Sequence, residues 1–540
     1  MKKFISLLLV ALLTLSVFTG CGDKEKTNTG GENIKAEDNN SKENKDAKEN
    51  EKQEDNKFLC SEKPITLSIF QFIQTPFKDD YAVFKKAAEM TNISLKGVVS
   101  QSSSKNKEAF NLMVVSGDLA DIVAWDRVKI QELALDGAFT ELDDLINEHA
   151  PNIKAFFEAH PDIKKHATAS DGKIYHIPYI PDGEAAEAWF IRQDWLDKLG
   201  LEQPKTIDEL HDVLVAFRDQ DPNGNKKQDE IPFFTRGTNR NRLADFALLW
   251  GAHVGASNLW YVEDGVVKFG PYEKEFKDAY VNLAKWYEEG LIDKEIYTRG
   301  KTARDYALKE NLGGMTHDWF GSTSGYNGKV DIEGFKFVPF APPANVNGEI
   351  KERSLRSRLH WSGWGIASTN KHPVETIKYF DFFFTEEGRR LMNFGIEDDT
   401  YTMQDGKPIF TDKVLKAEEG AVAAIRKYGC QLATGFQQDF NYEKQWMNPV
   451  AYEGVKLYSE NKYFMEQFPS GLPYTPDEKR RFSELFVAIE TSLEETTQKW
   501  VLGGEDVNSG YDSFIKTLEN FGVKELIEIQ QTAYDRYIGK

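Results

Sequence analysis

The strongest constraint on the fold is a regular alternation of strand and helix patterns that begins after residue 60. Apolar residues at every second position predict a strand over Ile65–Ile69, and a helical pattern follows over Tyr81–Met90. A second strand is expected over Ile93–Val99 and a second helix over Lys107–Ser116. The short apolar run Asp121–Trp125 is typical of a buried parallel strand. This βαβαβ order predicts an α/β fold.

Further helical patterns occur along the chain. Thr206 and Glu209 form a capping box before an apolar stripe that predicts a helix to Phe217. Pro373–Phe384 is also expected to be helical and buried on several sides. The last hundred residues are mostly helical in pattern, with Phe514, Leu518 and Phe521 expected on one face.

The N-terminus carries the pattern of an export signal. Lys2 and Lys3 precede an apolar run that ends in small residues before Cys21. A cysteine at the cleavage point predicts a bacterial lipoprotein, with residues 1–20 as signal peptide and Cys21 as the lipidated (palmitate-bearing) residue. The expected location is extracytoplasmic, at the cell membrane, held by acyl chains because the segment is too short to span a bilayer. A plain secretory signal with an incidental cysteine is the alternative.

Residues 21–57 have the composition of a tether. They are rich in Lys, Glu, Asp and Asn, and they bury too little apolar surface to offset the entropy of ordering. A flexible coil of this length spans on the order of 30 Å. The folded body is therefore expected from residue 58 onward.

The charge balance limits the partners of the folded body. The 540-residue chain carries a net charge of −20, which disfavours general binding to nucleic acid or to an anionic membrane. Two local groups of arginines are either solvated surface or an edge that binds an anion: Arg236, Arg240 and Arg242, and Arg353, Arg356 and Arg358. Cys60 and Cys430 could pair, but they are too few for a disulfide framework or a metal cluster.

One loop has the spacing of a calcium site. Calcium prefers six to eight oxygen ligands at about 2.3–2.6 Å. The loop offers the side chains of Asp221, Asn223, Asn225, Asp229 and Glu230 and the backbone carbonyl of Lys227. It is not an EF-hand, because Pro232 stands at position 12 and Lys226 at position 6. A polar connection between a helix and a strand is the alternative, and a metal here would be structural.

Several segments together resemble a known family. Ile191–Leu201, Thr206–Leu210 and Asp221–Pro232 look like one block of the extracellular solute-binding proteins, of the large lipoprotein type that serves ABC importers of alginate and oligosaccharides. Ser116–Ile122 and Thr385–Gly395 resemble two further motifs of that family.

The resemblance implies a two-lobed fold that closes on a ligand in the cleft, with a helical C-terminal region. Residues 58–181 and 362–415 would form the N-lobe, and residues 182–361 and 416–540 the C-lobe. It also implies a structural Ca²⁺ held by the loop ligands, a saccharide ligand, permease subunits as partners, and a monomer.

Saccharides stack on aromatic rings while polar side chains hold their hydroxyls. The candidate aromatic residues are Trp125, Trp319, Trp361, Trp364, Tyr401 and Trp446, although large aromatics are more often core residues. The candidate polar partners are Asp126, Arg192, Arg236, Asp318 and Gln438. Trp286 and Trp500 are expected to be core residues.

The main hypothesis is a binding protein that captures an oligosaccharide by hinge closure and delivers it to a permease. One alternative is a secreted polysaccharide-active enzyme with two catalytic carboxylates, although the sequence carries no nucleophile elbow, His-Glu-x-x-His or phosphate loop. Another is a surface lipoprotein that senses without import.

Overall fold

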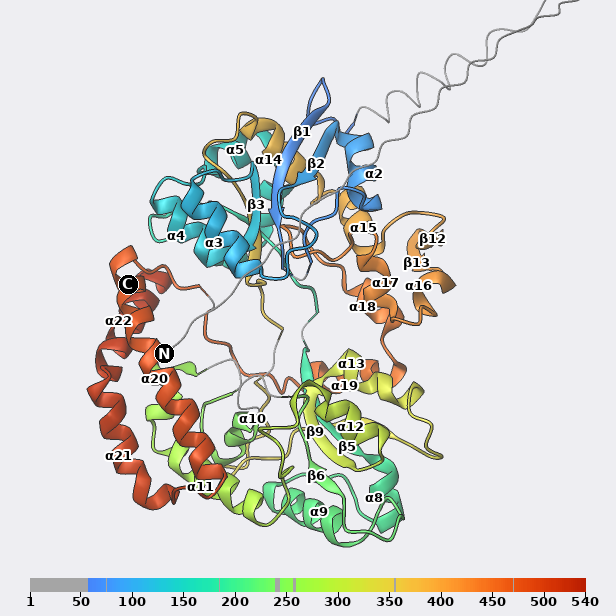
Figure 1. Ribbon diagram of the computed structural model, residues 1–540, viewed down its shortest axis with the longest axis vertical. Helices are drawn as coiled ribbons and strands as arrows, with labels where there is room; N and C mark the ends of the chain where they lie inside the picture. Colours follow the sequence, from blue (N-terminus) through green and yellow to red (C-terminus); the bar gives the residue numbers. More distant parts are fainter. Residues whose placement is uncertain are drawn as a thin grey trace, which may run out of the picture. The chain divides into compact units, whose positions relative to one another are not determined.

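The computed structural model describes residues 57–540, except residues 74, 184, 238–242, 256–258, 354–355 and 470. The expected signal peptide, Cys21 and residues 22–56 lie outside the described residues, as do Arg240 and Arg242. Within the described part, the chain forms two α/β lobes, each built around its own sheet (Figure 1). The predicted α/β class is confirmed.

The first sheet has five strands in the order β2–β1–β3–β11–β4. They are β1 (Ile65–Gln71), β2 (Ile93–Gly97), β3 (Ile122–Asp126), β4 (Ile177–Pro178) and β11 (Ser362–Ile366). β1 pairs in parallel with β2 and β3, which confirms the predicted βαβαβ unit, and β11 returns antiparallel between β3 and β4.

Helices cover the first sheet and connect its strands (Figure 1). They are α2 (Ala82–Thr91), α3 (Asn106–Ser116), α4 (Arg127–Leu135), α5 (Asp143–His149), α6 (Pro151–Ala159), α7 (Pro161–Ala167), α14 (Pro373–Phe382), α15 (Glu386–Phe394), α16 (Asp412–Leu415) and α17 (Ala421–Arg426). A hairpin joins β12 (Tyr401–Gln404) to β13 (Lys407–Phe410). α3 ends where Gly117 takes a left-handed backbone with φ of 71°. In α14 every residue from Tyr379 to Phe382 is buried, as predicted.

The second sheet has the order β10–β5–β9–β6. Its strands are β5 (Glu187–Arg192), β6 (Ile231–Phe233), β9 (Gly313–Trp319) and β10 (Phe337–Phe340). β5 runs antiparallel to β9 and β10, and β6 runs parallel to β9. Gly314 is required where β9 meets α9, because a Cβ there would lie 2.5 Å from the Phe217 ring.

The second lobe contains most of the remaining elements. Its helices are α8 (Gln193–Leu199), α9 (Ile207–Asp219), α10 (Ala244–Ala247), α11 (Glu275–Glu288), α12 (Ala303–Lys309), α13 (Phe320–Ser324), α19 (Pro449–Glu460), α20 (Pro476–Val501), α21 (Val507–Asn520) and α22 (Val523–Ile538). α18 (Phe440–Trp446) precedes α19, and a hairpin joins β7 (Trp260–Glu263) to β8 (Val266–Phe269). Single 3₁₀ turns occur at Leu248–Trp250, Gly270–Tyr272, Gly300–Thr302 and Gly325–Gly328.

The C-terminal helices share a core with the second lobe. Trp286 and Trp500 are buried in the cluster that also holds Phe514 and Leu518, as expected. Phe521 differs from the prediction, because it follows the last turn of α21 and is 39% exposed. The Thr475 hydroxyl accepts a hydrogen bond from the Glu478 amide, and the Glu478 carboxylate accepts one from the Thr475 amide. This capping box begins the long helix α20.

The hydrophobic cores show where the chain passes from one lobe to the other. It changes core between residues 180 and 185, between 340 and 359, and between 442 and 447. The third change comes later than the expected division between residues 415 and 416, because Ile425, Phe436 and Tyr442 pack in the first-lobe core. No hydrophobic pattern in the sequence distinguishes these residues from second-lobe ones.

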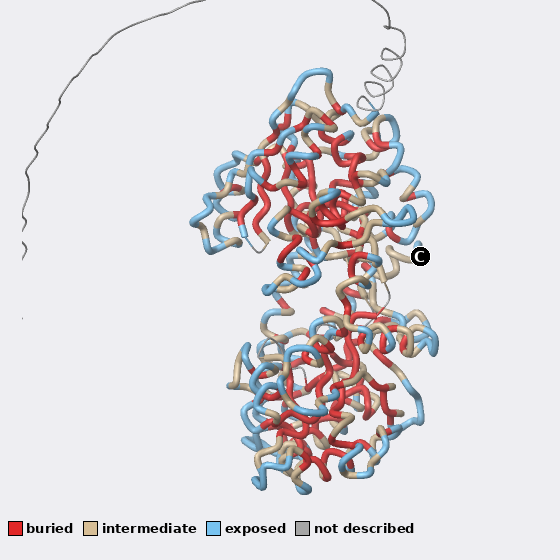
Figure 2. The backbone as a smooth tube through the Cα atoms, turned by 90° about the vertical axis from the view of Figure 1, so that its right-hand side faces the viewer, coloured by how far each residue is buried: buried red, intermediate tan, exposed pale blue. Residues whose placement is uncertain are grey.

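Buried residues gather in the interior of both lobes (Figure 2). Cys60 and Cys430 are both buried free thiols rather than a disulfide, and burial raises the pKa of Cys60 to about 12. Among the residues described, none of the helices combines the length and the apolar character that a membrane span requires.

Buried His176 gives the first lobe a pH-dependent stability. It precedes β4, and neither of its ring nitrogens has a hydrogen-bond partner among the described residues. Burial lowers its pKa from 6.5 to about 3, and Arg127 adds to this effect. Because only the unfolded chain takes up the proton between these values, stability falls as the pH drops below 6.5.

We predict that lowering the pH from 7 to 5 removes about 2 kcal/mol of unfolding free energy through His176 alone. Urea unfolding at pH 7 and pH 5 gives the change in unfolding free energy with pH for the wild type and for His176→Leu. The difference between these two changes is the contribution of His176. Equal pH dependence in the two proteins would contradict the assignment to His176.

Candidate functional site

The carboxyl edge of the second sheet brings together three of the predicted ligand residues. Asp318 and Trp319 end β9, and Arg236 follows β6 by three residues. Because β6 and β9 are parallel, both strands end at the same edge, where ligands bind in open α/β sheets. Trp319 is 41% exposed there.

The Asp318 carboxylate is fully buried between two guanidinium groups. Arg304 Nη1 lies 2.7 Å from Asp318 Oδ2, and Arg236 Nε lies 3.4 Å from Oδ1. The Trp319 amide also donates to Asp318 Oδ1 at 2.8 Å. The ion pairs hold the strand end in place, and each carboxylate oxygen of Asp318 faces a guanidinium group.

Arg304 is a residue of this edge that the sequence reasoning missed. It comes from α12, and its Nη1 also donates to Ser322 Oγ at 3.0 Å and Thr323 Oγ1 at 3.1 Å. Nothing in the sequence distinguishes it from a solvated helix arginine.

The corresponding edge of the first sheet carries Trp361. This residue precedes β11 and is 46% exposed. Asp126 lies at the same edge, opposite Ser362, but its carboxylate caps α4 by accepting from the amides of Val128 and Lys129 at 2.9 and 3.0 Å. The Asp126 side chain therefore serves as the N-cap of α4, and its Oδ1 is already occupied by backbone amides.

Trp446 lies close to the second-sheet edge. A Cβ added to Gly321 would be 2.9 Å from the Trp446 ring, so the indole rests on the backbone two residues beyond Trp319. Trp446 is half-buried, and its Nε1 has no hydrogen-bond partner among the described residues.

Three predicted aromatic ligands are instead core residues. Trp364 is fully buried and stacks on Phe380 with ring centroids 4.2 Å apart. Trp125 stacks on Phe110 at 4.9 Å, and Tyr401 is 4% exposed in the first-lobe core. Their rings are already covered by protein, so the prediction that they stack on a ligand is corrected.

Two predicted polar ligands also have structural partners. Arg192 is buried between the Trp195 and Phe335 rings and binds Asp194 through two nitrogens, at 2.9 and 2.6 Å. It lies at the opposite end of β5 from Trp319, because β5 and β9 are antiparallel. Gln438 is buried where the chain leaves the first lobe, and it accepts from the Asp182 amide at 3.2 Å.

The second arginine group does not form one basic edge. Arg356 makes a two-nitrogen contact with Glu443 at 2.6 and 2.9 Å, and Arg358 pairs with Asp162 at 3.1 Å. Arg353 is buried with a pKa lowered by burial to about 10. The three side chains serve different partners.

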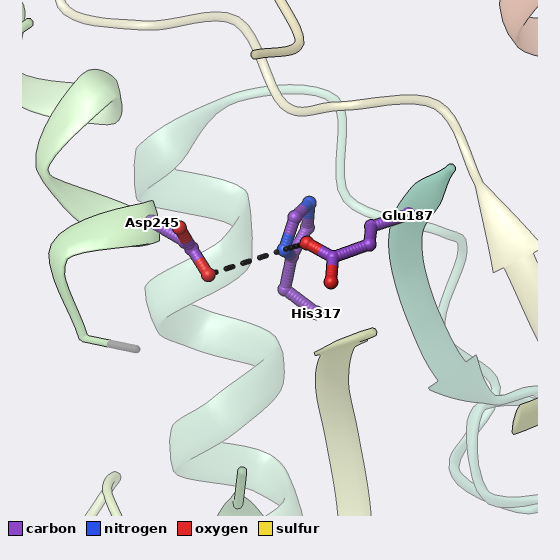
Figure 3. Close-up of side chains that lie close together, drawn as sticks. All are labelled: Glu187, Asp245 and His317. Carbon is purple, nitrogen blue, oxygen red and sulfur yellow. Dashed lines mark ion pairs between the residues drawn. The ribbon is translucent and has the colours of Figure 1, made fainter. Parts of the chain in front are cut away.

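A buried histidine lies directly before Asp318 on β9. His317 Nε2 is 3.1 Å from Glu352 Oε2, while Nδ1 faces Asp245 Oδ2 at 3.4 Å and Glu187 Oε2 at 3.9 Å (Figure 3). Burial alone would lower the pKa of His317, but Glu352 and Asp245 raise it well above its usual range. The surroundings therefore favour a positive charge at this imidazole.

The predicted calcium loop connects α9 to β6. Its backbone takes the left-handed conformation at Asp221, Gly224 and Lys226, with φ of 47°, 77° and 65°. Lys226, at position 6 of the loop, therefore adopts the left-handed backbone conformation that glycine would take with less strain. The Asn223 and Asn225 side-chain oxygens accept from the amides of residues 225 and 227 at 2.9 and 2.7 Å, which closes the loop on itself.

The carboxylates of this loop lie close together, and several of their oxygens accept no hydrogen bond from the described residues. Both oxygens of Glu230 and Oδ1 of Asp221 are buried without a hydrogen-bond partner among the described residues. Burial raises the pKa of Glu230, and the nearby Asp221 and Asp229 add to the shift. A cation would satisfy these buried carboxylate oxygens, so the residues present fit a calcium ion.

These features agree with the comparisons to known proteins. The chain matches the family model of the bacterial extracellular solute-binding protein over residues 66–390, and it belongs to this family.

Curated relatives extend the match along most of the chain. It is 28% identical over 465 residues to the fructooligosaccharide ABC transporter substrate-binding protein FusA of Streptococcus pneumoniae, covering 80% of this chain and 82% of that protein. It is 25% identical over 472 residues to the polygalacturonan/rhamnogalacturonan-binding protein YtcQ of Bacillus subtilis, covering 85% and 89%.

Solved structures give the same fold. The alginate-binding protein AlgQ2, crystallised without calcium ion, superposes with a TM-score of 0.77 and 38% identity over 89% of this chain and 99% of that one. An EF-hand mutant of FusA bound to fructo-nystose superposes at 0.72 with 23% identity, over 88% of this chain and 100% of that one.

We predict that Arg304→Met lowers the unfolding free energy by about 3 kcal/mol. The buried Asp318 carboxylate would lose its 2.7 Å ion pair and keep only Arg236, at 3.4 Å, as a charged partner. Urea unfolding checks this, and the double variant Arg304→Met/Asp318→Asn should recover part of the loss. The matched control Lys309→Met removes an exposed pair on the same helix and should cost less than about 1 kcal/mol. Equal losses in Arg304→Met and Lys309→Met would contradict the structural role of the buried pair.

Proposed function

We propose that this protein captures an oligosaccharide outside the cytoplasm by closing its two lobes on it, and that it delivers the ligand to the permease of an ABC importer. The observation that carries this is an exposed tryptophan at the carboxyl edge of each sheet, Trp361 in one lobe and Trp319 in the other. The family and the saccharides bound by FusA, YtcQ and AlgQ2 support it.

The proposed contacts divide between stacking and hydrogen bonding. Trp319, Trp361 and Trp446 offer apolar faces to the C–H surfaces of sugar rings, while Arg236 beside Asp318 offers donors to their oxygens. Contacts from two lobes are complete only when the lobes close, so the ligand shifts the equilibrium toward the closed form.

We predict that Trp319→Ala weakens saccharide binding roughly 30-fold, equivalent to about 2 kcal/mol, as expected for an aromatic contact near the centre of a site. A thermal-shift screen of neutral and acidic oligosaccharides identifies the ligand, and calorimetry compares the variants. Phe521→Ala, which removes an exposed aromatic ring just after α21, is the matched control and should bind normally.

The same samples separate binding from catalysis. Small-angle scattering should show a more compact protein with the ligand, and product analysis should recover the saccharide unchanged. Release of cleaved sugar, or an unchanged envelope with every saccharide that binds, would contradict capture by closure.

We further propose that the loop between α9 and β6 holds a structural Ca²⁺. Its ligands would be the side chains of Asp221, Asn223, Asn225, Asp229 and Glu230 and the carbonyl of Lys227. Bound calcium would offset two of the three negative charges on the carboxylates of Asp221, Asp229 and Glu230. The buried oxygens of Glu230, which have no hydrogen-bond partner among the described residues, support this assignment. So do AlgQ2, which was solved without calcium ion, and the EF-hand mutant of FusA.

We predict that a calcium chelator lowers the melting temperature of the wild type and that Asp229→Ala removes this sensitivity. Calcium at about 100 times its Kd would contribute about 2.7 kcal/mol to stability. Asp212→Ala, which removes an exposed carboxylate from α9, is the control and should respond like the wild type. A wild type that is insensitive to the chelator would rule out the metal.

The anchor and the assembly complete the proposal. Lipidated Cys21 and the charged segment to residue 57 would hold a monomeric body near the membrane, within reach of the permease subunits. The basis for this part is the sequence pattern at the N-terminus together with the extracellular character of the family.

A further inference from the structure

One arginine side chain contacts all three chain segments that pass between the lobes. These crossings are residues 180–185, 340–359 and 442–447. Arg356 lies in the second crossing, and its Nη1 donates to the backbone carbonyl of Asp182, in the first crossing, at 2.9 Å. The same guanidinium binds the Glu443 carboxylate, in the third crossing, through Nη1 at 2.6 Å and Nη2 at 2.9 Å. Arg356 therefore joins the three crossings at one point.

The first and third crossings also contact each other directly. The Gln438 amide donates to the Ile180 carbonyl at 2.9 Å, and the Phe440 amide donates to Asp182 Oδ2 at 2.8 Å. A Cβ added to Gly183 would lie 2.7 Å from the Phe440 ring, so the first crossing packs against the chain that leads into the third. Arg356 adds the second crossing to this pair.

The ion pair at this point is shielded from water. The side chains of Arg356 and Glu443 are 12% and 11% exposed. The attraction within a buried ion pair is largely offset by the cost of removing both charges from water, so such a pair adds little net stability. Its planar two-nitrogen geometry does fix the direction in which the partner lies. An arginine that also holds a carbonyl of another segment can therefore set the relative positions of three segments.

The relative positions of the crossings decide how the lobes can move. In hinge closure, a few residues between two rigid bodies absorb the change in backbone angles. If three crossings bend independently, the lobes sample many orientations, and a ligand that contacts both lobes must pay the entropy of ordering them. Crossings that are held together restrict the lobes to fewer orientations before the ligand arrives.

We propose that Arg356 is a positioning residue of the hinge, which holds the three crossings together so that the lobes move along one path. Its partners in this role are the Asp182 carbonyl and the Glu443 carboxylate, and it needs no contact with the ligand. The inference rests on the proposed capture of a saccharide by lobe closure, and it adds the residue that limits the freedom of the unliganded lobes.

Pulsed electron paramagnetic resonance on the unliganded protein tests the proposal through the distance between two spin labels. Lys107→Cys on α3 and Asp208→Cys on α9 place one label on an exposed helix position in each lobe. Cys21→Ser removes the N-terminal thiol, and Cys60 and Cys430 are buried. We expect Arg356→Met to lose the main peak of the wild-type distance distribution and to give a broader one. A role in local stability alone would lower the melting temperature and leave the distribution unchanged.

Two further variants complete the experiment. Arg358→Met is the matched control, because Arg358 lies two residues further along the same crossing and pairs with Asp162 at 3.1 Å, but its side chain is 59% exposed. This variant should keep the wild-type distribution. Arg356→Met/Glu443→Gln leaves no lone buried carboxylate, so it serves as the test if the single variant fails to fold, and it should show the same broadening.

A wild-type distance distribution in the folded double variant would overturn the proposal, as would equal broadening in Arg358→Met. Because the measurement uses no ligand, it can fail while saccharide capture holds. Conversely, a wild type that closes on none of the saccharides would contradict the proposed function and would not change the distributions of the unliganded variants.

Discussion

Parallel pairing of distant strands is the constraint on which the candidate ligand site depends. β6 and β9 end at one edge of the second sheet, so Arg236 and Asp318 meet there although they are far apart in the sequence. The antiparallel β5 contributes its first residue, Glu187, to the same edge, opposite Trp319. One sheet edge therefore holds an exposed tryptophan, a buried ion pair and the histidine cluster, because strand direction decides which ends coincide.

The features that could be predicted from the sequence are those carried by neighbouring residues. The period-two strand at Ile65–Ile69 and the N-cap at Thr206 each have their signal within a few neighbouring residues. Of the predicted capping box only the Thr206 half forms, because the Glu209 carboxylate accepts from the Lys205 amide. The candidate oxygen ligands of the loop Asp221–Glu230 follow one another along the chain, so their spacing alone predicts a cation site. The structure adds the burial of Glu230, which depends on how α9 and β6 pack.

The features that could not be predicted depend on register and on tertiary contact. Trp361 and Trp364 are three residues apart, yet one precedes β11 and is exposed while the other lies inside the strand and is fully buried. A shift of one residue in the register of a strand moves every side chain of that strand to the other face of the sheet, so a small error in register reverses which residues are exposed. Arg304 and the partners of His317 come from separate elements, so no local pattern could connect them.

The buried carboxylates of the second lobe bear on how closure could work. Asp318 is neutralised by arginines from two segments, and Glu230 lies in the loop where we propose a calcium ion. The proposed calcium ion would tie α9 to β6 at the end of that strand opposite the ligand-binding edge. A lobe that is already ordered loses little conformational entropy when it meets a ligand. More of the free energy of the ligand contacts would then be available to shift the lobes toward the proposed closed state.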